Sequence, residues 1–287
     1  RPRIKAIQSL PSASHRWFLK IENQALALLT ARNPADARRS RNALRRLLSN
    51  PPAGWELNVW LNATLECARI HRDRAESAED IEHARKQLTE ITRPTTSPLP
   101  PWHVAAALRL LAEIAATRES YDIALRILQK NVAPAFEQLN DTQSLAIARN
   151  QIARILYAQG DTDEALHIYQ DHTLPIFERL GDERMVAMTK GEIADILEAK
   201  GDIDQALHIR RHYEVPTYER LGDERSRAMA MGKIADILQA KGDLEHALKI
   251  RVHDEIPVYE RLGDIRMEAI TSGEIADIFE AKGDIDT

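Results

Sequence analysis

The sequence contains a single cysteine, Cys67, among its 287 residues, and aromatic residues make up only 5% of it. One cysteine excludes a disulfide framework within the chain and is typical of a reducing compartment. No apolar run approaches the roughly 20 residues that a membrane-spanning helix needs, and no signal peptide is recognisable. We therefore expect a cytoplasmic protein that makes no membrane contact.

The motifs that usually carry catalysis are also missing. Lys190-Gly191 lacks the earlier glycine and the following Ser or Thr of a phosphate-binding loop, and HExxH, CxxC and GxSxG do not occur. His208 and His212 are four residues apart, but the neighbouring units do not repeat the pair. Structural zinc normally takes four ligands, so an ordinary solvated helix face is the favoured interpretation. We expect no enzyme activity, no cofactor and no metal.

The charge balance argues against a general nucleic-acid binder, because the formal net charge is −5 and the pI is near 6.1. Residues 1–100 hold 17 Lys and Arg against 10 Asp and Glu, which gives +7 there and −12 for the rest of the chain. A dense basic run has no interleaved aromatic residues to stack on bases: Arg38, Arg39, Arg41, Arg45 and Arg46. A solvated face, or a contact with an acidic domain, is favoured over phosphate binding.

What the sequence does have is a repeat of about 41 residues. The repeat is marked by Gly160, Gly201, Gly242 and Gly283, and the same frame reaches further back through Pro134, Pro175, Pro216 and Pro257. Within one unit, apolar residues at helical spacing lie on both sides of Gly201 and predict two helices.

Local signals predict where these helices begin and end. Gly201 suits the left-handed conformation that closes a helix, Asp202 is expected to cap the next helix, and Leu221-Gly222-Asp223 repeats this signal. We also expect a kink or break near the proline inside each second helix. Because one small hairpin cannot bury its apolar face alone, the units must stack. The fold expected is all-α, a right-handed α-solenoid of antiparallel helix hairpins.

The solenoid is expected to have three parts. Residues 1–92 read as degenerate helical hairpins that cap the array, with a separate helical bundle as the alternative. Residues 93–101 contain four prolines and form the best candidate linker. Residues 102–287 form the array, with diverged units over 102–159, regular units over 160–282 and a truncated last unit. If the chain ends there, the open C-terminal end favours self-association.

The repeat resembles the tetratricopeptide repeat, whose signature is a small residue in helix A, a glycine at the turn and an alanine early in helix B. Ala194, Gly201 and Ala206 match these places. The unit is about one heptad longer than the usual 34 residues, and in this it is similar to the repeats of kinesin light chains and of bacterial signalling and defence proteins. The resemblance implies a scaffold or sensor that binds a protein or peptide in its concave groove, beside an effector domain of the same protein.

The resemblance also places specific helix A residues in that groove. An acidic ladder is expected from Asp195, Glu198, Asp236, Gln239, Asp277 and Glu280. The alternative for the ladder is an ion-pair network with repeated arginines such as Arg184, Arg225 and Arg266. Residues that break the repeat pattern are stronger ligand candidates, and these are Arg109, Glu113, Asn150, Arg154 and Tyr157.

A glycine inside helix A of each regular unit indicates a close approach, since glycine there costs about 1 kcal/mol relative to alanine. These residues are Gly191, Gly232 and Gly273. Either tight packing or space for a ligand backbone explains them. Two other functions stay open, namely regulation by a short peptide or small molecule, and a structural homo-oligomer.

Overall fold

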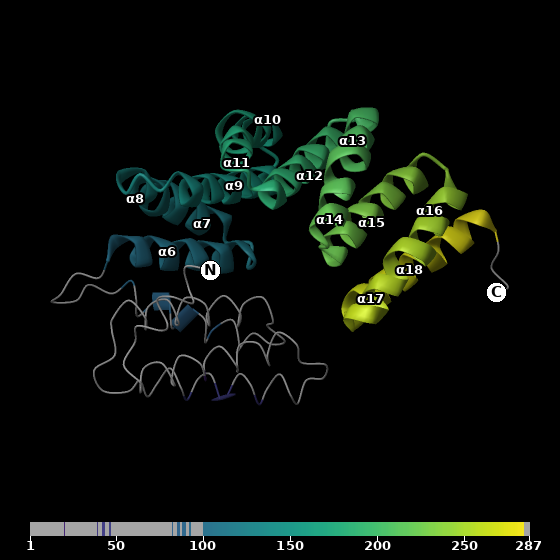
Figure 1. The fold of residues 1–287 in the computed structure, drawn as a ribbon, viewed down its shortest axis with the longest axis horizontal. Helices are drawn as coiled ribbons and strands as arrows, with labels where there is room; N and C mark the ends of the chain where they lie inside the picture. Colours follow the sequence, from purple (N-terminus) through teal and green to yellow (C-terminus); the bar gives the residue numbers. More distant parts are fainter. Residues whose placement is uncertain are drawn as a thin grey trace. The chain divides into compact units, whose positions relative to one another are not determined.

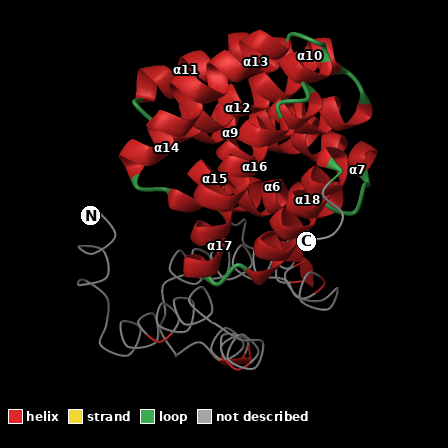
Figure 2. Cartoon of the chain, turned by 90° about the vertical axis from the view of Figure 1, so that its right-hand side faces the viewer, coloured by secondary structure: helices red, strands yellow, loops and turns green. Residues whose placement is uncertain are grey.

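The structure is a computed structural model that describes residues 100–283 and the isolated positions 20, 39, 42, 43, 46, 82, 85, 86, 88, 89 and 92. Within these residues the chain is helical, short loops join the helices, and no strand occurs (Figure 2). The hairpins expected over residues 1–92, most of the basic run and most of the linker lie outside the described residues. Those expectations stay predictions.

The chain divides into two compact units, residues 1–141 and 142–287. Described helices of the first unit are α6 (Pro101–Ala116), α7 (Tyr121–Ile127), the π-helical segment η1 (Leu128–Val132) and α8 (Ala133–Gln138). They form one hairpin, with α6 as its first helix and α7, η1 and α8 as its continuous second helix.

The second unit repeats this hairpin (Figure 1). The first helices, which we call helices A, are α9 (Thr142–Gln159), α12 (Glu183–Ala199), α15 (Glu224–Ala240) and α18 (Ile265–Lys282). The second helices, which we call helices B, consist of three segments each: α10 (Thr162–His167), η2 (Ile168–Thr173) and α11 (Leu174–Leu180); α13 (Ile203–Ile209), η3 (Arg210–Glu214) and α14 (Val215–Leu221); α16 (Leu244–Ile250), η4 (Arg251–Glu255) and α17 (Ile256–Leu262).

The sequence predicts a kink or break near the proline of each helix B, and the helix is not broken there: it continues through a π-helical segment that ends shortly before the proline. Pro216 is the second residue of α14, and α14 directly follows the π-helical segment η3. A proline has no N–H for the carbonyl four residues earlier and clashes with it. A π-helical turn joins residues five apart and so gives that carbonyl another donor. The same arrangement recurs at Pro134, Pro175 and Pro257.

The turn signals are confirmed with one correction. Gly201 and Gly222 have φ values of 86° and 66°, in the left-handed region that glycine tolerates. Asp223 caps α15, because its side chain accepts from the Ser226 N–H at 3.1 Å. Asp202 makes no such cap at α13 and instead accepts from the Gln205 side chain at 2.6 Å. At α16 Asp243 does accept from a backbone N–H, that of His246, but at 3.4 Å, which is longer than the 3.1 Å at α15.

The core runs without interruption from one hairpin to the next. The small signature residues Ala194, Ala206, Ala235 and Ala247 are all 0% exposed and share a cluster with Ile278 of α18. Because alanine keeps neighbouring helices close, larger side chains from adjacent units meet around these contacts. This is the stacked architecture of an α-solenoid.

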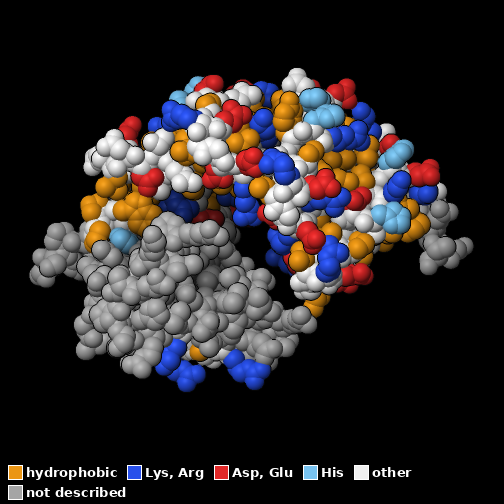
Figure 3. All heavy atoms as spheres, viewed as in Figure 1, with side chains coloured by type: hydrophobic (Ala, Val, Ile, Leu, Met, Phe, Trp, Pro, Cys, Tyr) orange, Lys and Arg blue, Asp and Glu red, His pale blue; other side chains and the backbone are white. Residues whose placement is uncertain are grey.

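Ion pairs between units recur on the surface of the array. Arg184 and Arg225 bind the capping aspartates of the following unit, Asp223 and Asp264, with N···O distances of 2.7 and 2.9 Å. Both signs of charge are interspersed over the described surface in Figure 3. Exposed pairs of this kind each contribute about 0–1 kcal/mol, so they add little to the stability of the array.

Candidate functional site

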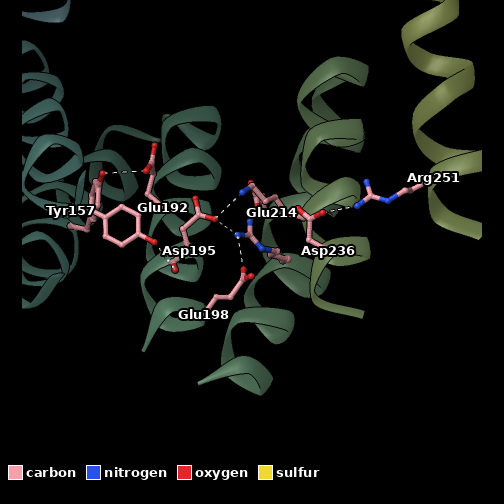
Figure 4. A network of polar contacts seen from close by, with 10 residues as sticks. Tyr157, Glu192, Asp195, Glu198, Glu214, Asp236 and Arg251 are labelled. Carbon is pink, nitrogen blue, oxygen red and sulfur yellow. Dashed lines mark hydrogen bonds and ion pairs between the residues drawn. The ribbon is translucent and has the colours of Figure 1, made fainter. Parts of the chain in front are cut away.

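Two buried arginines organise the polar centre of the array. Arg210 begins η3, is 1% exposed, and donates to Glu214 at 2.9 Å and to Asp195 of α12 at 2.5 Å. Glu198 lies 3.9 Å from the same guanidinium. One buried cation thus faces three carboxylates, and one face of helix A is fixed against helix B (Figure 4).

The next unit repeats this arrangement at η4. Arg251 is 1% exposed and binds Asp236 of α15 at 2.6 Å and Glu255 at 3.1 Å. Its third carboxylate is Glu274 of α18, at 2.5 Å. We call these two groups the Arg210 cluster (Arg210, Asp195, Glu198, Glu214) and the Arg251 cluster (Arg251, Asp236, Glu255, Glu274).

The helix A glycines leave room for the buried glutamates. A Cβ added at Gly191 would meet the carboxylate of Glu214, with its Cδ only 2.8 Å away. At Gly232 the Cδ of Glu255 would lie 2.9 Å from an added Cβ. The close approach inferred from sequence is therefore made by a side chain of the same unit, and the alternative of space for a ligand backbone is not needed at these two positions.

The excess of carboxylates has an electrostatic consequence. Burial raises the pKa of Glu214 to about 7 and that of Glu255 to about 7, although the neighbouring arginines act in the opposite direction. Burial also raises the pKa of Glu192, Glu198 and Glu274. Burial therefore makes Glu214 and Glu255 take up a proton as the pH falls through about 7, while the other carboxylates of each cluster face the arginine.

The pH dependence of stability follows from this shift. The unfolded pKa of a glutamate is near 4.5, so the stabilisation from protonated Glu214 and Glu255 is complete below pH 4.5 and is lost as pH rises through 7. We expect the free energy of unfolding to fall between pH 5 and 8 in urea titrations. The E214Q/E255Q variant should lose most of this slope. Burial lowers the pKa of His103, so this residue makes the protein less stable as the pH falls below 6.5. Because the wild type and the double variant share His103, the difference between their free energies of unfolding is the quantity to compare.

A slope that the double variant leaves unchanged would contradict this assignment. The carboxylates with lowered pKa values do not interfere, because the pKa values of Asp163, Asp223 and Asp243 lie below 3.8 and that of Glu82 lies below 4.5. Their effects therefore lie outside the window from pH 5 to 8.

Several of the expected groove residues form a strip on successive helices A. Tyr157 of α9 donates to the backbone carbonyl of Asp195 at 3.3 Å, and Asp195 in turn lies 3.9 Å from Lys233 of α15. The side chains of Glu198 and Asp236 remain 33% and 44% exposed while they bind the buried arginines. We call the set the helix A strip, and its members are Arg154, Tyr157, Asp195, Glu198, Asp236 and Gln239.

The other expected site residues lie elsewhere. Arg109 and Glu113 belong to α6 of the first unit and lie 3.9 Å apart, and both are half-buried. Asn150 is only 5% exposed and donates to Thr189 at 3.0 Å, so its amide serves packing between α9 and α12. Asp277 and Glu280 are exposed on α18. For all five of these residues, a role in binding a partner stays a prediction.

The sequence analysis left open that the acidic ladder pairs with arginines of the repeat. Such ion pairs do occur, but with arginines other than those expected. Arg184 and Arg225 bind the helix caps described above, whereas the ladder residues Asp195 and Asp236 bind Arg210 and Arg251 from helix B. Sequence reasoning missed these two arginines. The sequence did contain a signal for them. The two units with Gly191 and Gly232 in helix A also have an arginine and a glutamate four residues apart in helix B.

The other candidates from the sequence do not assemble into a site. His208 and His212 are exposed and their rings contact each other, with centroids 4.5 Å apart. Among the described residues, no three His, Cys, Asp or Glu side chains are grouped so that they could hold a metal ion. In the same part of the chain, every helix is too short or too polar to cross a membrane.

Comparison with solved structures places the fold in the class of tetratricopeptide-like helical solenoids. One similar structure is a signal transduction ATPase with numerous domains from Pyrococcus horikoshii, which has a tetratricopeptide repeat sensor. It is 18% identical with a TM-score of 0.64 over 86% of this chain. The match spans only 35% of that protein's length. No protein-family model matches the sequence, and a search of curated proteins finds no match either.

Two further structures show the same fold. A Rap protein complexed with Competence and Sporulation Factor is 15% identical with a TM-score of 0.64, over 95% of this chain and 73% of the other. A putative kinesin light chain from Podospora anserina, with nearly identical tetratricopeptide-like repeats, is 15% identical with a TM-score of 0.51, over 70% and 96%. At these identities the similarity defines the fold alone.

Proposed function

We propose that the chain is a non-catalytic recognition scaffold that binds a protein or peptide along the helix A strip. The observation that carries this proposal is the strip itself. Three successive helices present polar side chains there, and two of these side chains are held by buried arginines of helix B. Asp195 and Asp236 are held by arginines that are each 1% exposed, so their carboxylates are ordered before any partner arrives. Ordered groups cost less entropy on binding than free side chains.

The charge of the strip favours a cationic partner. Carboxylates outnumber the arginine and Lys233 around the Arg210 cluster, and Glu198 and Asp236 remain partly exposed. A lysine or arginine of a bound segment would balance this surplus at the partly exposed carboxylates of Glu198 and Asp236. Complementary charge of this kind mainly supplies specificity and a faster association rate.

We further infer that the array is the sensor of a larger bacterial signalling or defence protein. This rests on the repeat architecture, which one structural neighbour uses as the sensor of a signal transduction ATPase. In this mechanism, partner binding shifts the stacked hairpins against one another, and an attached effector responds. Unchanged effector activity when the partner is added to the complete protein would contradict it.

The binding proposal is tested by affinity capture from lysate with the whole chain, followed by mass spectrometry. The strip variant carries Arg154→Ala, Glu198→Gln and Gln239→Ala, which leaves both buried arginines and their aspartates in place. A matched control carries Gln170→Ala, Arg179→Ala and Glu219→Gln at exposed positions of helices B. We expect the control to capture as much of the partner as the wild type does, and the strip variant to capture at least tenfold less of it.

Other outcomes separate the alternatives. Equal capture by the strip variant and the control would move the binding surface away from the strip and overturn the proposed site. If none of the three proteins captures a partner, the alternative function is favoured, in which the chain binds a short peptide or a small molecule. The similar Rap protein was solved as a complex with Competence and Sporulation Factor, so ligand binding is known for this fold.

A further inference from the structure

A row of apolar side chains lies beside the helix A strip. Met229 of α15 is 46% exposed, although Ala228 and Ala230 on either side of it are only 0% and 2% exposed. Met188 of α12 and Ile147 of α9 occupy the same place in the two preceding units, and both are half-buried between buried neighbours. We call these three side chains, Ile147, Met188 and Met229, the apolar row. Each of three successive helices A therefore turns one large apolar side chain away from the core.

The apolar row and the carboxylates of the strip lie on one face of each helix. Met229, Lys233 and Asp236 follow one another at steps of four and three residues, and all three are exposed or partly exposed. Met188 precedes Asp195 by seven residues, as Met229 precedes Asp236. Seven residues are about two helical turns, or roughly 10.5 Å. The apolar row and the carboxylates are thus separated by about the diameter of a helix with its side chains, roughly 10–12 Å.

The charges on this face are unevenly placed. Arg154 of α9 occupies the place that Asp195 and Asp236 have in α12 and α15, and its guanidinium lies 3.9 Å from Glu192. The side chains of Asp195, Glu198 and Asp236 are 28%, 33% and 44% exposed. Cationic groups of a partner are therefore favoured over α12 and α15 and disfavoured over α9.

We propose that this face binds an amphipathic helix that has apolar side chains along one side and lysines or arginines along the other. The inference rests on the proposed function, because it names the class of partner that the helix A strip takes. The apolar side of the partner covers the apolar row, and its cations meet the carboxylates of Asp195, Glu198 and Asp236. Neither row alone defines the partner, since the apolar row gives no preference for charge and the carboxylates give none for shape.

The spacing along the apolar row favours a helix over an extended segment. Packed neighbouring helices lie about 8–10 Å apart, so the row presents one apolar side chain at roughly that interval. A helix that crosses them returns a side chain to the same side every seven residues, or about 10.5 Å. An extended chain does so every second residue, or about 6.6 Å, which does not match. Two of the three side chains are methionines, whose flexibility lets the row adapt to different apolar partners.

The test uses the full 287-residue chain and a labelled designed peptide, measured by fluorescence anisotropy. The peptide has about 21 residues, or roughly 30 Å of helix, with leucines at the first and fourth places of each heptad and lysines beside them. We expect saturable binding that the double variant Met188→Gln and Met229→Gln weakens at least tenfold. Glutamine keeps the length of the side chain and the helix propensity but removes the apolar surface.

A matched control removes exposed apolar side chains from second helices instead. It carries Ile123→Gln and Val252→Gln, at positions that are 55% and 40% exposed, and should bind the peptide as the wild type does. The strip variant should also bind it more weakly, and added salt should weaken binding by the wild type more than binding by the strip variant.

Three altered peptides test the chemistry of the partner. One has glutamate in place of every lysine, one has glutamine in place of every leucine, and one has prolines in its second heptad, which prevent a helix. Each should bind the wild-type chain at least tenfold more weakly than the designed peptide.

Four results would overturn the proposal. These are no saturable binding of the designed peptide at millimolar concentration, equal binding by the double methionine variant, equal binding of the glutamine peptide, and equal binding of the proline peptide. The last result would make the occupant an extended segment. The proposed function is judged separately, because lysate capture compares the wild type with a strip variant in which both methionines are intact.

Discussion

Replacing Arg210 with methionine is expected to lower the free energy of unfolding by roughly 3–5 kcal/mol at pH 8. The guanidinium is 1% exposed and is the cation shared by Asp195, Glu198 and Glu214. Without it, Glu214 would be a buried carboxylate beside other carboxylates. Protonation relieves this repulsion, so the loss should be smaller at pH 5 than at pH 8. Urea unfolding followed by circular dichroism at the two pH values measures both effects.

Two companion variants identify the cause of this loss. Arg220→Met removes an arginine that is 58% exposed and paired with Glu183, so it should cost about 0–1 kcal/mol. The double variant R210L/E214V should recover most of the loss, because the first unit has Leu128 and Val132 at these two places and buries both. A single-variant loss no larger than that of Arg220→Met would show that the buried arginine does not hold the cluster.

The second large effect is that glycine-to-alanine substitutions at two equivalent positions should change the free energy of unfolding in opposite directions. Gly232→Ala should lower the free energy of unfolding by roughly 1–3 kcal/mol, because Glu255 is 3% exposed and must give up Arg251 to avoid the new methyl group. Gly273→Ala should raise it by up to about 1 kcal/mol, since nothing occupies the space beside it and alanine favours the helix. Thermal and urea unfolding of the two variants, measured together, make the comparison.

A third variant isolates the contact responsible. With Glu255→Ala in the background, Gly232→Ala should no longer be destabilising, because the atoms that it displaces are gone. If Gly232→Ala is as harmless as Gly273→Ala in the wild-type background, the glutamate moves aside freely and the cluster is not rigid.

The repeat frame made the hairpins predictable from the sequence. Constant spacing fixed which residues share a place, so the burial of Ala194 and Ala235 and the left-handed turn at Gly201 were expected and are confirmed. The internal glycines also indicated a close approach. Periodicity was sufficient for these features because each depends on residues near in the sequence or on the stacking of equal units.

The details of helix B were not predictable in the same way. A proline inside a helix indicates a disturbance, but the choice between a break and a π-helical turn depends on how the flanking residues pack. Arg210 looked like an ordinary surface arginine, because its burial depends on Asp195 and on the space at Gly191 in another helix. The partners of the acidic ladder were therefore assigned to the wrong arginines.

The Arg210 cluster is drawn entirely from one hairpin, since Gly191, Asp195, Arg210 and Glu214 lie on α12 and the helix B that follows it. A unit copied as a whole carries its cavity, its cation and its carboxylates together. Gene duplication can therefore lengthen or shorten the array without separating a buried arginine from the aspartate and glutamate of its own hairpin, although Arg251 also binds Glu274 of the next hairpin. A substitution at one member, by contrast, harms its own hairpin until a second substitution follows there, so these positions should change in pairs as copies diverge.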